Sequence, residues 1–114
     1  MLMSYLENQV KNSIARGDQN PIGLFSRVVE ISSDKNLSHG QFTLVDASGG
    51  DIDVTLPRPL NSSVVTVKKI DDTGNAVNVL TPNSETIDGQ SSLSITSQYT
   101  SREIASDGDD YYIK

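Results

Sequence analysis

The sequence predicts a mostly β fold, an antiparallel β-sandwich or barrel-like body behind a short N-terminal helical arm. From residue 27 onward, short segments rich in Val, Ile and Thr alternate apolar and polar residues with the period of two that is typical of strands. Turn-forming sequences separate these segments at intervals of about ten residues, which favours an antiparallel all-β fold. Before them, residues 4–16 carry apolar residues at helical spacing, which predicts the arm.

The arm is predicted from a narrow apolar stripe, in which Leu6, Val10 and Ile14 stand four residues apart, and Gly17 is a plausible end of the helix. A helix of about three turns is marginal by itself in water, so this stripe must pack on something. Two partners stay open. The stripe packs on the chain's own body or its copies, or it anchors the chain to a larger assembly.

The chain divides into two parts, an arm with a polar linker at residues 1–25 and a strand-rich module at residues 26–114. The linker is marked by Pro21 and Gly23, which interrupt regular structure. The candidate anchor or trimer-interface residues are the large apolar side chains of the first part: Leu2, Tyr5, Leu6, Val10, Ile14, Leu24 and Phe25.

About eight strands are predicted in the module, and sequences such as Ser-Gly-Gly and Asp-Gly connect them. They cover residues 27–32, 41–46, 51–56, 64–70, 76–80, 92–96, 102–105 and 111–114. The third alternates most clearly, with Ile52 and Val54 inward and Asp53 outward, and the second carries Phe42 and Leu44 on one face. The module shows no internal repeat.

The composition predicts a thin core, because only 35% of the residues are apolar and 5% are aromatic. Small chains of this kind often complete their cores by associating, so we expect an oligomer whose copies share apolar faces. The net charge of −6, with scattered Lys and Arg residues, argues against a nucleic-acid partner. No apolar run is long enough for membrane insertion, and the first residues lack the features of a signal peptide, so we expect a soluble protein that is made in the cytoplasm.

The sequence gives no support for catalysis, a metal site or a cofactor. His39 is the only histidine, and the chain has no cysteine, so neither a hydrolytic triad nor a zinc site is indicated. The acidic run at residues 107–110 lacks the spacing of a calcium loop and is interpreted as a hairpin turn. We therefore expect a non-enzymatic protein.

Three tyrosines that cluster late in the sequence are the candidate glycan contacts: Tyr99, Tyr111 and Tyr112. Aromatic rings provide stacking surfaces for sugars, but packing within a sheet is the competing interpretation of the same residues.

Several short motifs in a fixed order resemble a β module of bacteriophage fibre and virion-surface proteins. They are the VTLP, VKKID, NAVNV and IDG sequences within residues 54–89, followed by residues 93, 98–99, 101, 106–108 and 112–113. The resemblance covers residues 27–114. The closing aromatic of such modules is often tryptophan, whereas Tyr111 and Tyr112 occupy that region here.

The resemblance implies a non-enzymatic, usually trimeric unit on the virion surface. A single module behind a helical arm favours a trimeric head fibre or capsid decoration protein, attached to the major capsid protein or another virion protein through the arm. The alternative is a tail-fibre or baseplate-associated module that binds a host-surface glycan.

Overall fold

The computed structural model describes residues 27–114, which contain nine strands in two sheets and no helix. In chain order, the strands are β1 (Arg27–Ile31), β2 (Lys35–Asn36), β3 (Gln41–Val45), β4 (Ile52–Thr55), β5 (Asn61–Lys69), β6 (Val77–Leu80), β7 (Ser92–Ile95), β8 (Ser101–Asp107) and β9 (Tyr111–Ile113). The mostly β fold predicted from the sequence is confirmed.

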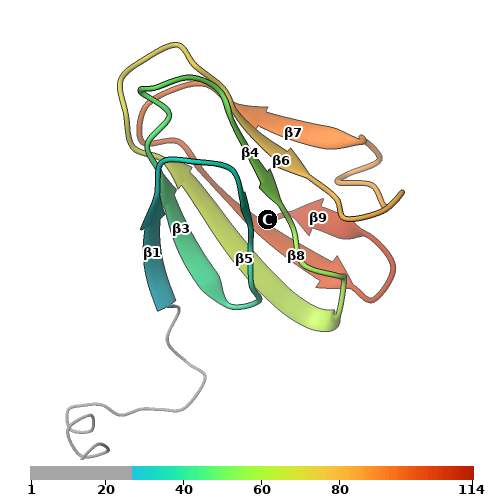
Figure 1. The fold of residues 1–114 in the computed structure, drawn as a ribbon. Coiled ribbons are helices and arrows are strands. Elements are labelled where there is room, and N and C mark those ends of the chain that lie inside the picture. Colours follow the sequence, from blue (N-terminus) through green and yellow to red (C-terminus); the bar gives the residue numbers. More distant parts are fainter. Residues whose placement is uncertain (1–26) are drawn as a thin grey trace, which may run out of the picture.

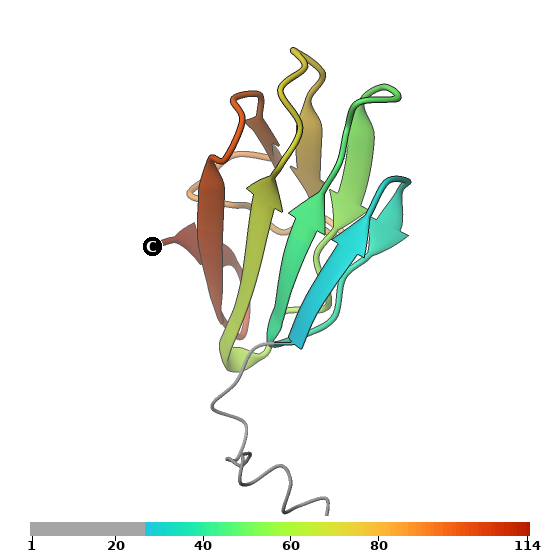
Figure 2. The ribbon, with the colours of Figure 1, turned by 90° about the vertical axis from the view of Figure 1, so that its left-hand side faces the viewer.

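The two sheets face each other as the layers of a sandwich (Figure 1). The five-stranded sheet has the order β1-β3-β5-β8-β9, and the four-stranded sheet has the order β2-β4-β6-β7. Figure 2 shows the five-stranded sheet in front, with β1, β3, β5 and β8 side by side and the other sheet behind it. The alternative of a closed barrel is not what residues 27–114 adopt.

The first six strands stack as coils, each of which contributes one strand to each sheet. β1 and β2 form the first coil, β3 and β4 the second, and β5 and β6 the third. Neighbouring coils pair in parallel, with Thr43 opposite Val67 in one sheet and Val54 opposite Val79 in the other.

The expectation of an entirely antiparallel fold is therefore wrong for β1 to β6. It assumed that each turn is a hairpin within one sheet, whereas these turns carry the chain across to the opposite sheet. The next strand of the first sheet then starts from the same end, which makes the pairing parallel. Antiparallel pairing holds only where β7, β8 and β9 are added to β6, β5 and β8.

The core lies between the sheets and is formed by residues of both. Its buried apolar residues are Leu37, Val45, Ala47, Ile52, Val54, Leu56, Val65, Val67, Val77, Val79, Ile87, Ile95, Ile104 and Tyr111. The buried residues are mainly Val, Ile and Leu, and Tyr111 is the one aromatic residue among them. Small β-branched side chains that alternate on facing strands fill the interior without large aromatic residues.

All eight predicted strands are present, and the predicted inward positions of Ile52 and Val54 are confirmed. The short strand β2 was not predicted, because an alternation of apolar and polar residues cannot be recognised in only two residues. The N-terminal helical arm and its candidate anchor or interface residues lie outside the described residues: Leu2, Tyr5, Leu6, Val10, Ile14, Leu24 and Phe25.

Candidate functional site

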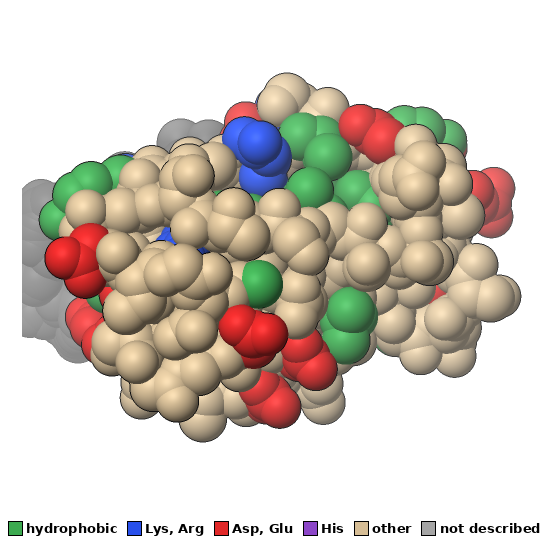
Figure 3. All heavy atoms as spheres, turned by 90° about the horizontal axis from the view of Figure 1, so that it is seen from above, with side chains coloured by type: hydrophobic (Ala, Val, Ile, Leu, Met, Phe, Trp, Pro, Cys, Tyr) green, Lys and Arg blue, Asp and Glu red, His purple; other side chains and the backbone are tan. Residues whose placement is uncertain are grey.

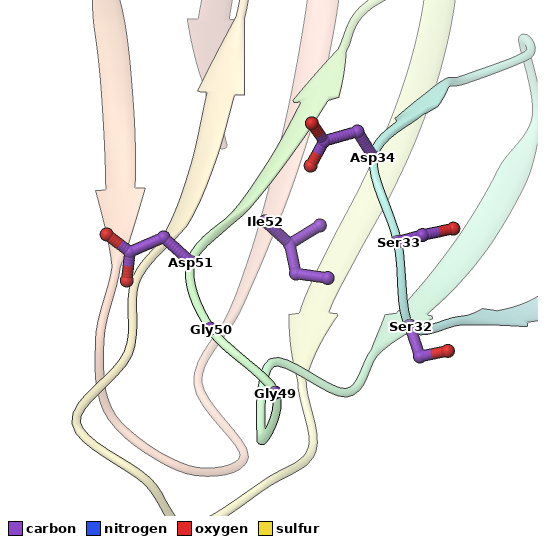
Figure 4. A pocket seen from close by; sticks show the side chains of 7 residues that line it. All are labelled: Ser32, Ser33, Asp34, Gly49, Gly50, Asp51 and Ile52. Atoms are coloured by element: carbon purple, nitrogen blue, oxygen red, sulfur yellow. The ribbon is translucent and has the colours of Figure 1, made fainter.

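An open pocket of about 450 Å³ lies at one edge of the sandwich, where the first two coils cross between the sheets. Ser32, Ser33 and Asp34 line one side, and residues 49–52 line the other. Figure 4 shows the Ile52 side chain between the two segments, with Asp34 directed toward this gap and Asp51 directed away from it. The lining is small and polar, apart from Ile52.

The two carboxylates at this pocket hold neighbouring coils together. Asp34 Oδ1 accepts a hydrogen bond of 2.9 Å from the backbone N–H of Asp53, the residue opposite it in the next coil. Asp51 Oδ1 accepts an equivalent bond of 2.8 Å from Ala76. Each carboxylate satisfies a backbone N–H of the next coil, one inside β4 and one directly before β6. We therefore interpret the pair as structural rather than as an acid and a base.

A similar arrangement is buried at the end of β5. Lys69 Nζ donates to Asp71 Oδ2 at 2.6 Å, to the Thr73 carbonyl at 2.8 Å and to the Asp71 carbonyl at 3.1 Å. Asp71 Oδ1 accepts the Ala47 N–H at 2.7 Å. Burial raises the pKa of Asp71, but the bonds from Lys69, Thr73 and Ala47 lower it more, and the net pKa lies well below the ordinary value. All three protons of the ammonium group are used, so this Lys is a structural group rather than a nucleophile.

The single histidine, His39, is an exposed loop residue, and its Nδ1 forms a hydrogen bond with Ser63 Oγ. In the part of the chain that the structure describes, no group of three His, Asp or Glu residues could hold a metal ion. Nor does that part contain a helix long and apolar enough to cross a membrane.

The three candidate glycan contacts occupy different environments. Tyr111 is only 3% exposed and belongs to the core, where its hydroxyl donates to the Pro57 carbonyl. Burial, followed by the charges of Glu85 and Asp110, raises the pKa of Tyr111 to about 12. A glycan cannot reach this ring, so Tyr111 is a structural residue and not a surface contact.

Tyr99 and Tyr112 do lie on the surface, with exposed fractions of 63% and 46%. Tyr99 has a positive φ of 63°, a conformation that residues other than glycine seldom adopt. Its ring lies 5.7 Å from Lys68 Nζ, within the range of a cation–π contact. Tyr112 instead lies across from Ala105 in the β8–β9 pair.

The side of the five-stranded sheet turned away from the core, here called the outer face, carries apolar side chains among charged and polar ones. Its apolar side chains are Val28, Phe42, Leu44, Val64, Ala105 and Tyr112. In β3, Gln41, Thr43 and Val45 are buried, and the two apolar residues between them point outward. The predicted shared face of Phe42 and Leu44 is confirmed, but this face is the outer one.

The corresponding side of the four-stranded sheet is mainly polar. Asn78 Nδ2 donates to Asp53 Oδ1 at 3.0 Å, and Ser94 Oγ donates to Asn78 Oδ1 at 2.8 Å, which forms a hydrogen-bonded row across three strands. Figure 3 views one end of the molecule. Acidic side chains are scattered over this end, and on one side of it hydrophobic side chains lie next to a basic one. The outer face is mixed, because Glu30 and Lys68 flank Leu44 and Thr66 stands beside Phe42 in the register of β1, β3 and β5.

No family model matches the chain, and no curated protein matches it. The site must accordingly be interpreted from its geometry. Sequence reasoning missed the outer face, because the alternation in β3 gives two classes of residue without saying which class faces the core. The alternation of Gln41 and Thr43 with Phe42 and Leu44 shows that one pair faces the core and the other faces away, but it does not say which pair is inside.

Proposed function

We propose that the protein is a non-enzymatic structural protein of a bacteriophage virion, most specifically a homotrimeric head fibre or capsid decoration protein. In this proposal the N-terminal arm attaches the chain to the major capsid protein or another virion protein. The body stands on the virion surface, and its stacked coils provide a stable unit.

The observation that carries the proposal is the use of the charged side chains. Asp34 and Asp51 connect successive coils, and Asp71 and Lys69 close the third coil in the core. Asp110 Oδ1, outside the three coils, likewise accepts a backbone N–H, that of Thr86, at 2.8 Å. An enzyme would keep such charged groups available for reaction. In this protein they form hydrogen bonds with backbone N–H groups and with one another. That pattern supports a structural role.

The two edges of the five-stranded sheet differ, and the free one supports association between copies. At one edge, residues 86–88 cover β9, with Tyr111 N–H donating to the Thr86 carbonyl at 2.9 Å. At the other edge lies β1, where the bonds of Arg27 and Ile31 point toward β3 and those of Val28 and Glu30 point away. Within residues 27–114 nothing pairs with that edge. Unpaired edges invite association, and closed symmetry protects them.

A threefold axis beside β1 would also explain attachment. β1 begins at Arg27, directly after the arm, so three β1 strands near one axis bring three arms to the same end of the trimer. Three linked arms bind a repetitive virion surface with an avidity that can exceed the affinity of one arm by about 10²–10⁴-fold.

Co-sedimentation with capsids purified from the encoding phage tests this function. We expect the wild-type protein to sediment with capsids and Val10→Asp, which places a charge in the apolar stripe, to remain in solution. Asn8→Asp is the matched control, because it adds the same charge outside the stripe. Equal sedimentation of both variants, or none of the wild type, would contradict attachment through the arm.

The second candidate is a tail-fibre or baseplate-associated module that binds a host-surface glycan, and Tyr99 favours it. Its exposed ring is held in an unfavourable backbone conformation beside Lys68, and such strain is concentrated at functional sites. A glycan array tests the idea with Tyr99→Ala and the control Tyr112→Ala. Binding that is lost only in the first variant supports the candidate, and an array without any signal removes it.

A further inference from the structure

Two adjacent lysines at the end of β5 have different environments. Lys69 is buried, and its ammonium group donates to Asp71 and Thr73. Lys68 lies on the outer face, and among residues 27–114 no carboxylate forms an ion pair with its Nζ. The ammonium group lies instead over the ring of Tyr99, 5.7 Å from the ring centre. The ring thus holds the charge of Lys68 in a defined place, where it is available to a ligand.

The turn that carries Tyr99 is fixed to the end of β5. The Tyr99 N–H donates to the Lys69 carbonyl at 2.7 Å, and Gln98 Nε2 donates to the Ile70 carbonyl at 3.2 Å. The φ of Tyr99 is 63°, which glycine adopts without strain and tyrosine does not. The strain brings the ring no burial, because Tyr99 is 63% exposed. Packing therefore does not explain a tyrosine at this position, whereas binding does.

A second cation lies beside Lys68 and Tyr99. Ser101 stands opposite Lys68 in the β5–β8 pair. The Ser101 carbonyl accepts a hydrogen bond of 3.3 Å from Arg102 Nη1. The next acidic residue along β8 is Glu103, which faces Lys114 at 3.8 Å. Two cations and an exposed aromatic ring therefore gather at the start of β8, on a chain whose net charge is −6.

We infer that Tyr99, Lys68 and Arg102 bind a saccharide that carries a carboxylate. The apolar face of the sugar ring stacks on Tyr99, and the carboxylate accepts charge-assisted hydrogen bonds from Lys68 and Arg102. The planar fork of Arg102 matches a carboxylate in particular. The inference rests on the second candidate function, the binding of a host-surface glycan, and names the class of that glycan.

Other ligands complement this cluster less well. A neutral sugar stacks on Tyr99 but leaves the charges of Lys68 and Arg102 unused. A nucleic acid presents a row of phosphates and needs an extended basic surface. The basic surface here is local, because only Leu44 separates Lys68 from Glu30 in the register of β1, β3 and β5. A single carboxylate on a sugar ring requires no more than the two cations at the start of β8.

A glycan array probed with the full-length protein tests the inference. The array carries sialylated and uronic-acid oligosaccharides, each beside its carboxyl-reduced form. We expect the acidic forms to bind and the reduced forms to bind at least about tenfold more weakly, since each reduced form lacks the charge-assisted hydrogen bonds. Equal binding of the two forms would overturn the inference and leave the glycan candidate standing. An array without any signal would remove both.

Three variants show whether the named residues form the site. Lys68→Gln should lower the affinity for the acidic form about tenfold. Lys35→Gln is the matched control, because it removes an exposed charge on β2 and should leave the affinity unchanged. Tyr99→Gly removes the ring together with the backbone strain, so binding should be lost while circular dichroism shows a folded protein. Binding that survives Tyr99→Gly, or equal losses in the two lysine variants, would overturn the inference.

Discussion

The ammonium group of Lys69 lies 2.6 Å from the carboxylate of Asp71, and their side chains are 0% and 5% exposed. A charge buried to this extent is tolerated only with a partner and with hydrogen bonds for its remaining protons. The Thr73 carbonyl and the Ala47 N–H complete the arrangement, so the pair connects the second coil to the third.

Replacing Asp71 with Asn should strongly destabilise the protein, because it leaves the Lys69 charge buried without a counterion. We expect a loss of about 3–5 kcal/mol in the free energy of unfolding, measured with urea. Glu103→Gln is the control. Its exposed pair with Lys114 spans 3.8 Å, and such pairs contribute less than about 1 kcal/mol. Equal losses in the two variants would contradict a special role for the buried pair.

The same pair predicts a dependence of stability on pH. Because folding lowers the pKa of Asp71, the folded state binds its proton less readily than the unfolded state does. The stabilisation is therefore present above the ordinary pKa of 3.8 and is lost as the pH falls below it. We expect the urea midpoint of the wild type to fall in this range, and that of Asp71→Asn to fall less. Parallel curves would show that other carboxylates dominate.

Thr43 should be replaceable by Val with a gain in stability. Its Oγ1 is buried and has no hydrogen-bond partner among the described residues. Val has nearly the same shape without the hydroxyl, so Thr43→Val should raise the free energy of unfolding by about 1–2 kcal/mol. Thr55→Val is the control. Its side chain lies on the side of the four-stranded sheet turned away from the core, so the change in the free energy of unfolding should be less than about 0.5 kcal/mol. A loss of stability in Thr43→Val would indicate a hydrogen bond that the hydroxyl does make.

Tyr111 should make the protein sensitive to alkali. Its pKa is raised to about 12 from 10.0, so its contribution to stability is complete below pH 10 and is lost as the pH rises toward 12. Tyr111→Phe should lose about 1 kcal/mol at neutral pH with its bond to Pro57, yet unfold less steeply in alkali. Circular dichroism across this pH range measures both effects. An unchanged alkaline profile would contradict the assignment of Tyr111.

Deletion of residues 1–20 should leave a folded, β-rich body, because the core cluster lies entirely within residues 37–111. Circular dichroism and cooperative thermal unfolding provide the measurement. A truncated chain without a cooperative transition would mean that the arm is part of the core. Attachment to capsids, in contrast, should be lost.

The strands could be predicted from the sequence, because alternation such as that of Ile52, Asp53 and Val54 is a local property. Their parallel pairing could not, since it depends on whether a turn returns the chain to the same sheet or carries it to the other one. The coils are also unequally spaced along the sequence. Arg27 pairs with Gln41, 14 residues later, whereas Thr43 pairs with Val67, 24 residues later, so no fixed period appears in the sequence.

The candidate site was less predictable than the fold, for physical reasons that particular residues show. Tyr111 and Tyr112 are adjacent, yet one ring is in the core and the other is exposed, because successive strand residues point to opposite faces. Phe42 and Leu44 have the composition of core residues and nevertheless face outward, while Gln41, Thr43 and Val45 occupy the inner positions. Only the placement of the second sheet decides between these alternatives.

The most direct test of the proposed trimeric assembly is the mass of the full-length protein in solution, measured by size-exclusion chromatography with light scattering at micromolar concentration. The account predicts three times the 12.3 kDa of one chain. A single species with the mass of one chain would contradict it.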